Sequence, residues 1–252
     1  MTTSAAFAYV FNVVLFSRLV FTFEDKPLST GQTAVMLAVQ ALGLLAFEVG
    51  LPLILLTAAL GMIGAALAVV ENRIGRVKQP RLVSLVVYFA ALNVFFSPSI
   101  GLELSPRLVP FIRWIGSVCL ALARSGTTNW LRFHVTLAGA FLVINEVNTL
   151  VRYLFQVFNL EPKKEPGGGD EAAVDEEDYG AGRVIGILER VLVYHLVLND
   201  QYSAIGLVLA AKSFTRFKDL EKRQRAEYVL IGTLASTLLA MLTAAAVEGL
   251  LQ

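Results

Sequence analysis

The sequence predicts an all-α fold, a polytopic transmembrane helical bundle with about seven to nine hydrophobic helices. Of the 252 residues, 56% are hydrophobic and 16% are charged, whereas a soluble globular protein has about 25% charged residues. The mean hydropathy is +0.66. In residues 33–70 the only strongly polar side chains are Gln40 and Glu48. This run is long enough for two membrane-spanning helices, and its lack of alternation favours helices over a barrel.

Nine candidate helices follow from the apolar runs and the breaks between them. The first lacks the basic start of a cleavable signal peptide, so we expect it to be retained. A charged turn ending in Pro27 closes it, and Gly50 with Pro52 separates the second helix from the third. Pro98 and Pro106 bracket the break before the fifth. The candidates are residues 4–23, 31–48, 51–70, 82–97, 107–123, 133–158, 183–198, 202–217 and 226–250.

One long stretch is unsuited to a membrane helix. Residues 161–182 read EPKKEPGGGDEAAVDEEDYGAG, with two prolines, three consecutive glycines and many carboxylates. Such a segment cannot bury enough apolar area to fold alone. We expect an acidic flexible linker at residues 159–182, between an N-terminal membrane helical unit, residues 1–158, and a C-terminal membrane helical unit, residues 183–252.

Lysine and arginine in short loops favour the cytoplasmic side of a membrane. Two segments are rich in them, namely Arg73, Arg76, Lys78 and Arg81 in one, and Lys212, Arg216, Lys218, Lys222, Arg223 and Arg225 in the other. Five candidate helices separate the segments, and an odd number of crossings cannot return the chain to the same side. We therefore expect at least one candidate not to span. Residues 107–123 suit an interfacial helix best, and residues 183–198 are the second choice.

The predicted helix 133–158 carries a polar stripe made of Asn145, Glu146, Asn148, Thr149, Arg152 and Gln156. All but the flanking Glu146 recur at the spacing of one helix face. A charge at the bilayer centre costs about 2.5–3.5 kcal/mol, so such groups usually face protein or water. One interpretation is a ligand site or solute pathway. The other is that the asparagines bind a neighbouring helix while Arg152 reaches the membrane surface.

Rows of small residues are the second pattern. They are Gly232, Ser236, Ala240 and Ala244 in the last helix, and Gly206 and Ala210 in the helix before it. Small residues in one row let two helix backbones approach closely. We expect these helices to pack on each other or on a partner protein, although an alanine-rich chain also produces such rows by chance.

Glu189 and Arg190 lie inside an apolar run. One interpretation is a local charge pair at the helix surface, and the other is a docking surface for another helix.

Signals of catalysis and of cofactors are weak. His134 and His195 are the only histidines, and they are low-ranked haem ligands, with satisfied interfacial histidines as the favoured alternative. The single Cys119 cannot form an internal disulfide, and no cysteine–histidine cluster suggests zinc. The sequence lacks a Walker-type glycine loop, HExxH and GxSxG. We predict no catalytic residue, metal or other cofactor, and the net charge of +1 gives no reason to expect nucleic acid.

The segments ILERVL, AIGLVLAAKSFTRF and AEYVLIGTLAS resemble the C-terminal part of a family of uncharacterised bacterial multi-pass membrane proteins. NEVNTLVRYLF is similar to the segment that precedes an acidic linker there. The resemblance covers the chain from about residue 145 on. It implies a location in the bacterial cytoplasmic (inner) membrane and implies no activity.

Three function classes remain open. A non-catalytic subunit or scaffold of a membrane assembly is favoured, with the lipid bilayer and other membrane subunits, or a second copy of the chain, as partners. A small-solute or ion transporter is the alternative, suggested by the polar stripe together with Arg18 and Glu48. A membrane haem protein or enzyme is the weakest interpretation.

Overall fold

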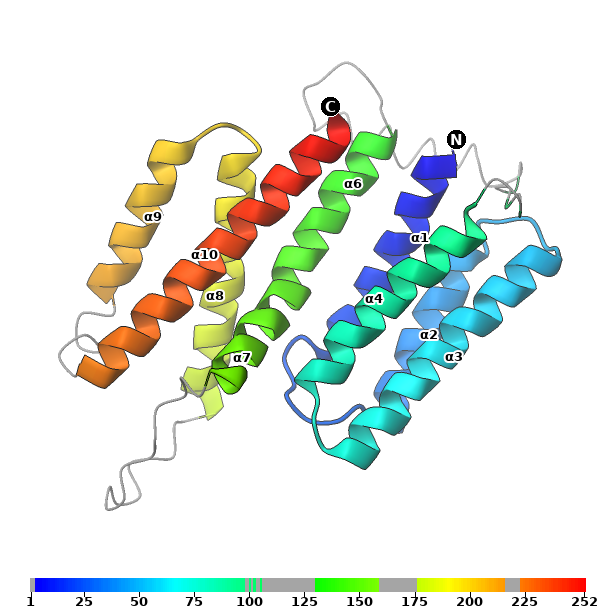
Figure 1. Ribbon diagram of the computed structural model, residues 1–252, viewed down its shortest axis with the longest axis horizontal. Helices are drawn as coiled ribbons and strands as arrows, with labels where there is room; N and C mark the ends of the chain where they lie inside the picture. The colour runs from blue at the N-terminus through cyan, green and yellow to red at the C-terminus, as the bar shows by residue number, and fades with distance from the viewer. Residues whose placement is uncertain are drawn as a thin grey trace. The chain divides into compact units, whose positions relative to one another are not determined.

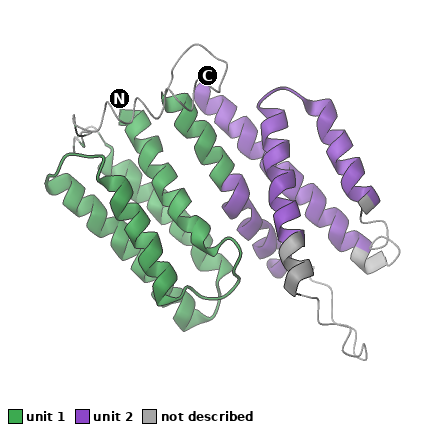
Figure 2. Ribbon diagram, turned by 180° about the vertical axis from the view of Figure 1, so that it is seen from behind, with its two compact units in different colours: residues 1–141 green, residues 142–252 purple. Residues whose placement is uncertain are grey.

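The computed structural model describes residues 3–97, 100, 102, 105, 130–158, 176–215 and 223–252. Helices dominate this part of the chain and no strand occurs in it, which confirms the all-α class (Figure 1). The chain forms two compact units, residues 1–141 and residues 142–252 (Figure 2). Within the predicted linker, residues 176–182 belong to a helix, and residues 159–175 lie outside the described residues together with the predicted interfacial helix 107–123.

Unit 1 contains α1 (Thr3–Ser17), which continues as the 3-10 turn η1 (Arg18–Phe21), α2 (Thr30–Leu44), α3 (Leu51–Ile74), α4 (Lys78–Phe95) and α6 (Trp130–Phe141). Local chemistry sets several of these bounds. Ser29 and Gln32 form a capping box at the start of α2, and Pro52 lies in the first turn of α3. Gly75 ends α3 with φ of +66°, a left-handed conformation that glycine adopts without strain.

The apolar core of unit 1 lies among α1, α2, α3 and α4. Val10, Leu56, Tyr88 and Leu92 are fully buried there. Gly43 lets α1 approach α2, because a Cβ atom at this position would lie 2.4 Å from Cγ1 of Val13. Any other residue at position 43 would therefore require the side chain of Val13 to move.

A buried ionic cluster, made of Arg18, Glu71 and Arg81, joins the segment after α1 to α3 and α4. Arg81 Nε donates to Glu71 Oε1 at 3.0 Å, and Arg18 Nη2 donates to the carbonyl of Arg81 at 2.7 Å. The backbone N–H of Leu28 donates to Glu71 Oε2 at 3.0 Å. Arg81 was assigned to a basic loop by its sequence context, but it is 3% exposed. Its guanidinium therefore lies inside unit 1 and not on a basic surface.

Unit 2 begins with a π-helical turn, Leu142–Glu146, followed by α7 (Val147–Val157), α8 (Glu176–Val197), α9 (Tyr202–Thr215) and α10 (Arg223–Leu251). The helix α8 packs on α9, on α10 and on the π turn, and α10 also packs on α7. Val193, Tyr194, Ile205, Ala240 and Ala244 are buried in this arrangement.

Four described helical segments are long and apolar enough to cross a membrane: Thr3–Phe21, Leu51–Ile74, Trp130–Val157 and Ala226–Leu251. The chain is therefore a membrane protein with several transmembrane-type helices. The α2 helix has 15 residues, fewer than the roughly 20 needed to span a bilayer at right angles. Within the described part of the chain, the structure thus supports four spans by length and composition, fewer than the seven to nine predicted.

Candidate functional site

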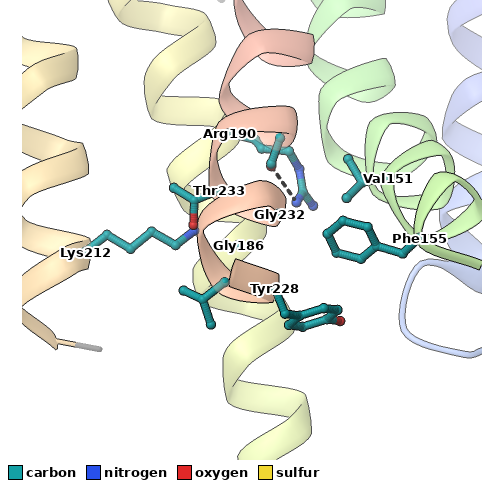
Figure 3. Close-up of a pocket in the computed structure, with 10 residues that line it drawn as sticks. Val151, Phe155, Gly186, Arg190, Lys212, Tyr228, Gly232 and Thr233 are labelled. Atoms are coloured by element: carbon teal, nitrogen blue, oxygen red, sulfur yellow. Dashed lines mark hydrogen bonds between the residues drawn. The ribbon is translucent and has the colours of Figure 1, made fainter. Parts of the chain in front are cut away.

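Unit 2 contains a pocket of about 150 Å³, called here the Arg190 pocket (Figure 3). Residues of α7, α8, α9 and α10 line it. They are Val151, Phe155, Gly186, Arg190, Lys212, Tyr228, Val229, Gly232, Thr233 and Ser236. The pocket thus combines two cationic side chains, hydroxyl groups and an apolar wall.

The guanidinium of Arg190 is the central polar group. Its side chain comes from α8 and points toward Val151 and Phe155 of α7 (Figure 3). Its Nε donates to the carbonyl of Val143 at 3.0 Å, and Val143 lies in the π-helical turn. Such turns are frequent at functional sites because they change the regular hydrogen-bond pattern of a helix. The π turn and α8 together hold Arg190 in place.

The described residues do not supply hydrogen-bond partners for every nitrogen of the buried Arg190 side chain. Only 6% of it is exposed, and Nη1 lies 3.5 Å from Ser236 Oγ, the long limit of a hydrogen bond. In the part of the chain that the structure describes, Nη2 has no hydrogen-bond partner. Leaving a buried donor unsatisfied costs about 1–3 kcal/mol, and more for a charged group. The pocket therefore contains a donor whose partner is not supplied by the described residues.

The electrostatics of the pocket favour a negative charge. The guanidinium of Arg152 repels that of Arg190, while the carboxylate of Glu189 attracts it. Glu189 also forms an ion pair with Lys212 of α9. An anion in the pocket would relieve the repulsion between the two guanidinium groups.

Two glycines let neighbouring side chains approach the helix backbones at the pocket. A Cβ atom at Gly186 would lie 3.5 Å from Arg190 Nη1, and one at Gly232 would lie 3.0 Å from Cζ of Phe155. The ring of Phe155 contacts Tyr228, with 4.9 Å between the ring centroids. The pocket is therefore aromatic where Phe155 and Tyr228 line it.

The predicted polar stripe does not form one continuous surface. Asn145, Glu146 and Thr149 are buried, Asn148 and Arg152 are half-buried, and Gln156 is exposed. Asn145 Nδ2 donates to Glu146 Oε1 at 2.9 Å. Both residues belong to the π turn, whose extra residue shifts the helix faces by about 100°. From α7, the residues that line the Arg190 pocket are instead Val151 and Phe155.

The small residues of α10 pack inside unit 2. Gly232 lies against Phe155, Ser236 lies near Arg190, and Ala240 and Ala244 are fully buried. The small residues of α9 differ from them. Gly206 and Ala210 are exposed, and a Cβ atom at Gly206 would meet nothing within 4 Å.

The two histidines have different surroundings. His134 is 5% exposed and its ring stacks on Trp130. Its Nδ1 lies 3.2 Å from Nδ2 of Asn12. His195 is exposed. Among the described residues, no group of three or more histidine, cysteine, aspartate or glutamate side chains could hold a metal ion. A haem at these histidines stays an untested hypothesis, and Cys119 lies outside the described residues.

Sequence reasoning did not single out Arg190 as a site residue. It treated Glu189 and Arg190 together, but adjacent residues on a helix point about 100° apart. In the structure Glu189 pairs with Lys212, whereas Arg190 contacts Val143 and Ser236. A charged residue inside an apolar run was the only signal available.

No family model, curated protein or solved structure matches the chain.

Proposed function

We propose that the protein is a multi-pass integral protein of the bacterial cytoplasmic membrane and acts as a non-catalytic subunit or scaffold of a membrane assembly. The observation that carries the proposal is a row of small residues on α9, called here the α9 stripe: Ser203, Gly206, Ala210 and Ser213. All four are exposed. Their spacing of three, four and three residues places them on one face of the helix.

The exposed face of α10 provides the comparison. Its bulky residues, Leu230, Leu234, Leu238 and Leu242, are 53–56% exposed. Large aliphatic side chains suit contact with lipid tails. On α10 the row Gly232, Ser236, Ala240 and Ala244 faces the interior of unit 2, as is usual where one helix packs on another. On α9 the small residues of the stripe face away from it. The α9 stripe therefore resembles a helix-packing surface without its second helix.

The occupant we propose for the α9 stripe is a transmembrane helix of another subunit. Small residues allow backbones to approach closely, and the serine hydroxyls of the stripe offer hydrogen bonds to such a helix. The α9 helix has 14 residues, which corresponds to a length of about 21 Å. A bilayer core is about 30 Å thick, so α9 by itself is shorter than a membrane-spanning helix.

The test is purification of the full chain from native membranes in a mild detergent, followed by identification of the proteins that co-migrate with it in fixed ratio. Gly206→Leu adds a large side chain to the stripe and is expected to remove these proteins. Ala211→Leu is the matched control, because Ala211 is exposed on α9 but lies outside the stripe. Retention of the same proteins by Gly206→Leu would contradict the proposal.

The second candidate is a small-solute or ion transporter. The burial of Asn145, Glu146 and Thr149 in an apolar helix supports it, because polar groups at membrane depth often mark pathways for solutes. A monomer or a homo-oligomer in the purification would favour this candidate. In that case Asn148→Ala and Arg152→Ala should impair transport or the growth that depends on it, and unchanged activity would exclude the polar stripe as the pathway.

A further inference from the structure

We infer that the Arg190 pocket binds a phosphate group, carried by a lipid headgroup or by a small soluble anion. The inference does not depend on the proposed role of α9. It rests on a buried guanidinium, that of Arg190, which lines a pocket of about 150 Å³ and whose Nη2 has no hydrogen-bond partner among the described residues. The planar fork of an arginine matches oxygen atoms of phosphate and carboxylate groups.

The donor set favours phosphate over carboxylate. Besides Arg190, the pocket is lined by the ammonium-bearing side chain of Lys212 and by the hydroxyl residues Thr233 and Ser236. Lys212 enters from α9 and Thr233 lies on α10 (Figure 3). Phosphate has more acceptor oxygens than the two of a carboxylate, so it can use donors from several helices at once. The two oxygens of a carboxylate would meet fewer of these donors.

The apolar wall fits an anion attached to a hydrophobic body. Val151, Phe155 and Val229 line the pocket beside the polar groups. Gly232 lies nine residues after Arg223, where α10 begins, which is about 13 Å along the helix axis. The site is thus in the N-terminal half of α10, and Lys212, which lines it, belongs to the basic segment that favours the cytoplasmic side. Basic pockets between helices on that side are suited to anionic headgroups.

The test is a binding titration of the full chain in an uncharged detergent. One arm uses inorganic phosphate, a second uses short-chain phosphatidylglycerol, and a third uses phosphatidylcholine of the same chain length, which has no net charge. The readouts are the dissociation constant and the rise in the temperature of thermal unfolding. We expect saturable binding in the first or second arm, and at least about tenfold weaker binding for Arg190→Met.

Two further variants separate loss of the site from loss of the fold. Arg132→Met removes one positive charge from an exposed position of α6 and should bind like the unmodified chain. Gly186→Leu keeps the charge of Arg190 but fills the space beside its Nη1, so it should also weaken binding. If Arg190→Met does not fold, Gly186→Leu and Arg132→Met decide the question.

The arms distinguish the two sources of the phosphate group. Binding of phosphatidylglycerol without inorganic phosphate would identify a lipid headgroup, and binding of inorganic phosphate would identify a soluble anion. If neither inorganic phosphate nor phosphatidylglycerol binds saturably, the inference is overturned. Equal affinities of the unmodified chain, Arg190→Met and Gly186→Leu would also overturn it, because binding would then occur elsewhere on the protein.

Discussion

Replacing Glu71 by glutamine should destabilise unit 1 strongly. Glu71 is fully buried and accepts three hydrogen bonds, from Arg81 Nε at 3.0 Å, from Arg81 Nη2 at 3.4 Å and from the backbone N–H of Leu28 at 3.0 Å. Glutamine keeps the shape of the side chain. It replaces one acceptor oxygen by an NH₂ group, however, and that group would face a donor.

The magnitude follows from these contacts. The charge-assisted bond from Arg81 Nε contributes about 1.5–3 kcal/mol. The substitution also leaves the guanidinium of Arg81, which is 3% exposed, without its carboxylate. Removing one partner of a buried ion pair costs about 3–5 kcal/mol in total. We expect a loss of this size in the free energy of unfolding of Glu71→Gln.

The assay is thermal unfolding of the purified protein in a mild detergent, with Glu48→Gln as the matched control. Glu48 is an exposed carboxylate, so its substitution should change the free energy of unfolding by no more than about 0.5 kcal/mol. A loss below about 1 kcal/mol for Glu71→Gln, or equal losses for the two variants, would refute the argument that the cluster stabilises unit 1 by charge pairing.

Two further predictions concern the local structure of unit 1, and thermal unfolding checks both. Gly43→Ala should lower the free energy of unfolding by about 1–3 kcal/mol, because the added Cβ atom would lie 2.4 Å from the stiff side chain of Val13. Gly61→Ala adds a Cβ atom that meets nothing within 4 Å, so it should raise that free energy by up to about 1 kcal/mol. Similar effects of the two variants would contradict this reasoning. Ser29→Ala should cost about 1 kcal/mol, because it removes the hydroxyl that accepts from the N–H of Gln32 at the start of α2, and an unchanged unfolding temperature would show that the capping box contributes nothing.

Much of the fold follows from the sequence, because membrane insertion depends on local properties. The length and apolar content of a run determine whether it can cross a bilayer, and both can be counted along the chain. The predicted start of the third helix at residue 51 agrees with α3, which begins at Leu51, because Gly50 and Pro52 fix that boundary locally. The small-residue rows were also visible, since their spacing is a property of a single helix.

What the sequence alone determined is therefore the all-helical class, the helices of transmembrane type and the row of small residues on one face of α10. Only the tertiary structure decided which faces are covered: the row from Gly232 to Ala244 on α10 packs internally, while Gly206 on α9 stays open. It also decided that Arg190 reaches the carbonyl of Val143, 47 positions away in the chain. Contacts at such separations depend on how whole helices pack, and the π turn changes the register between them, so no periodicity along one helix predicts the Arg190 pocket.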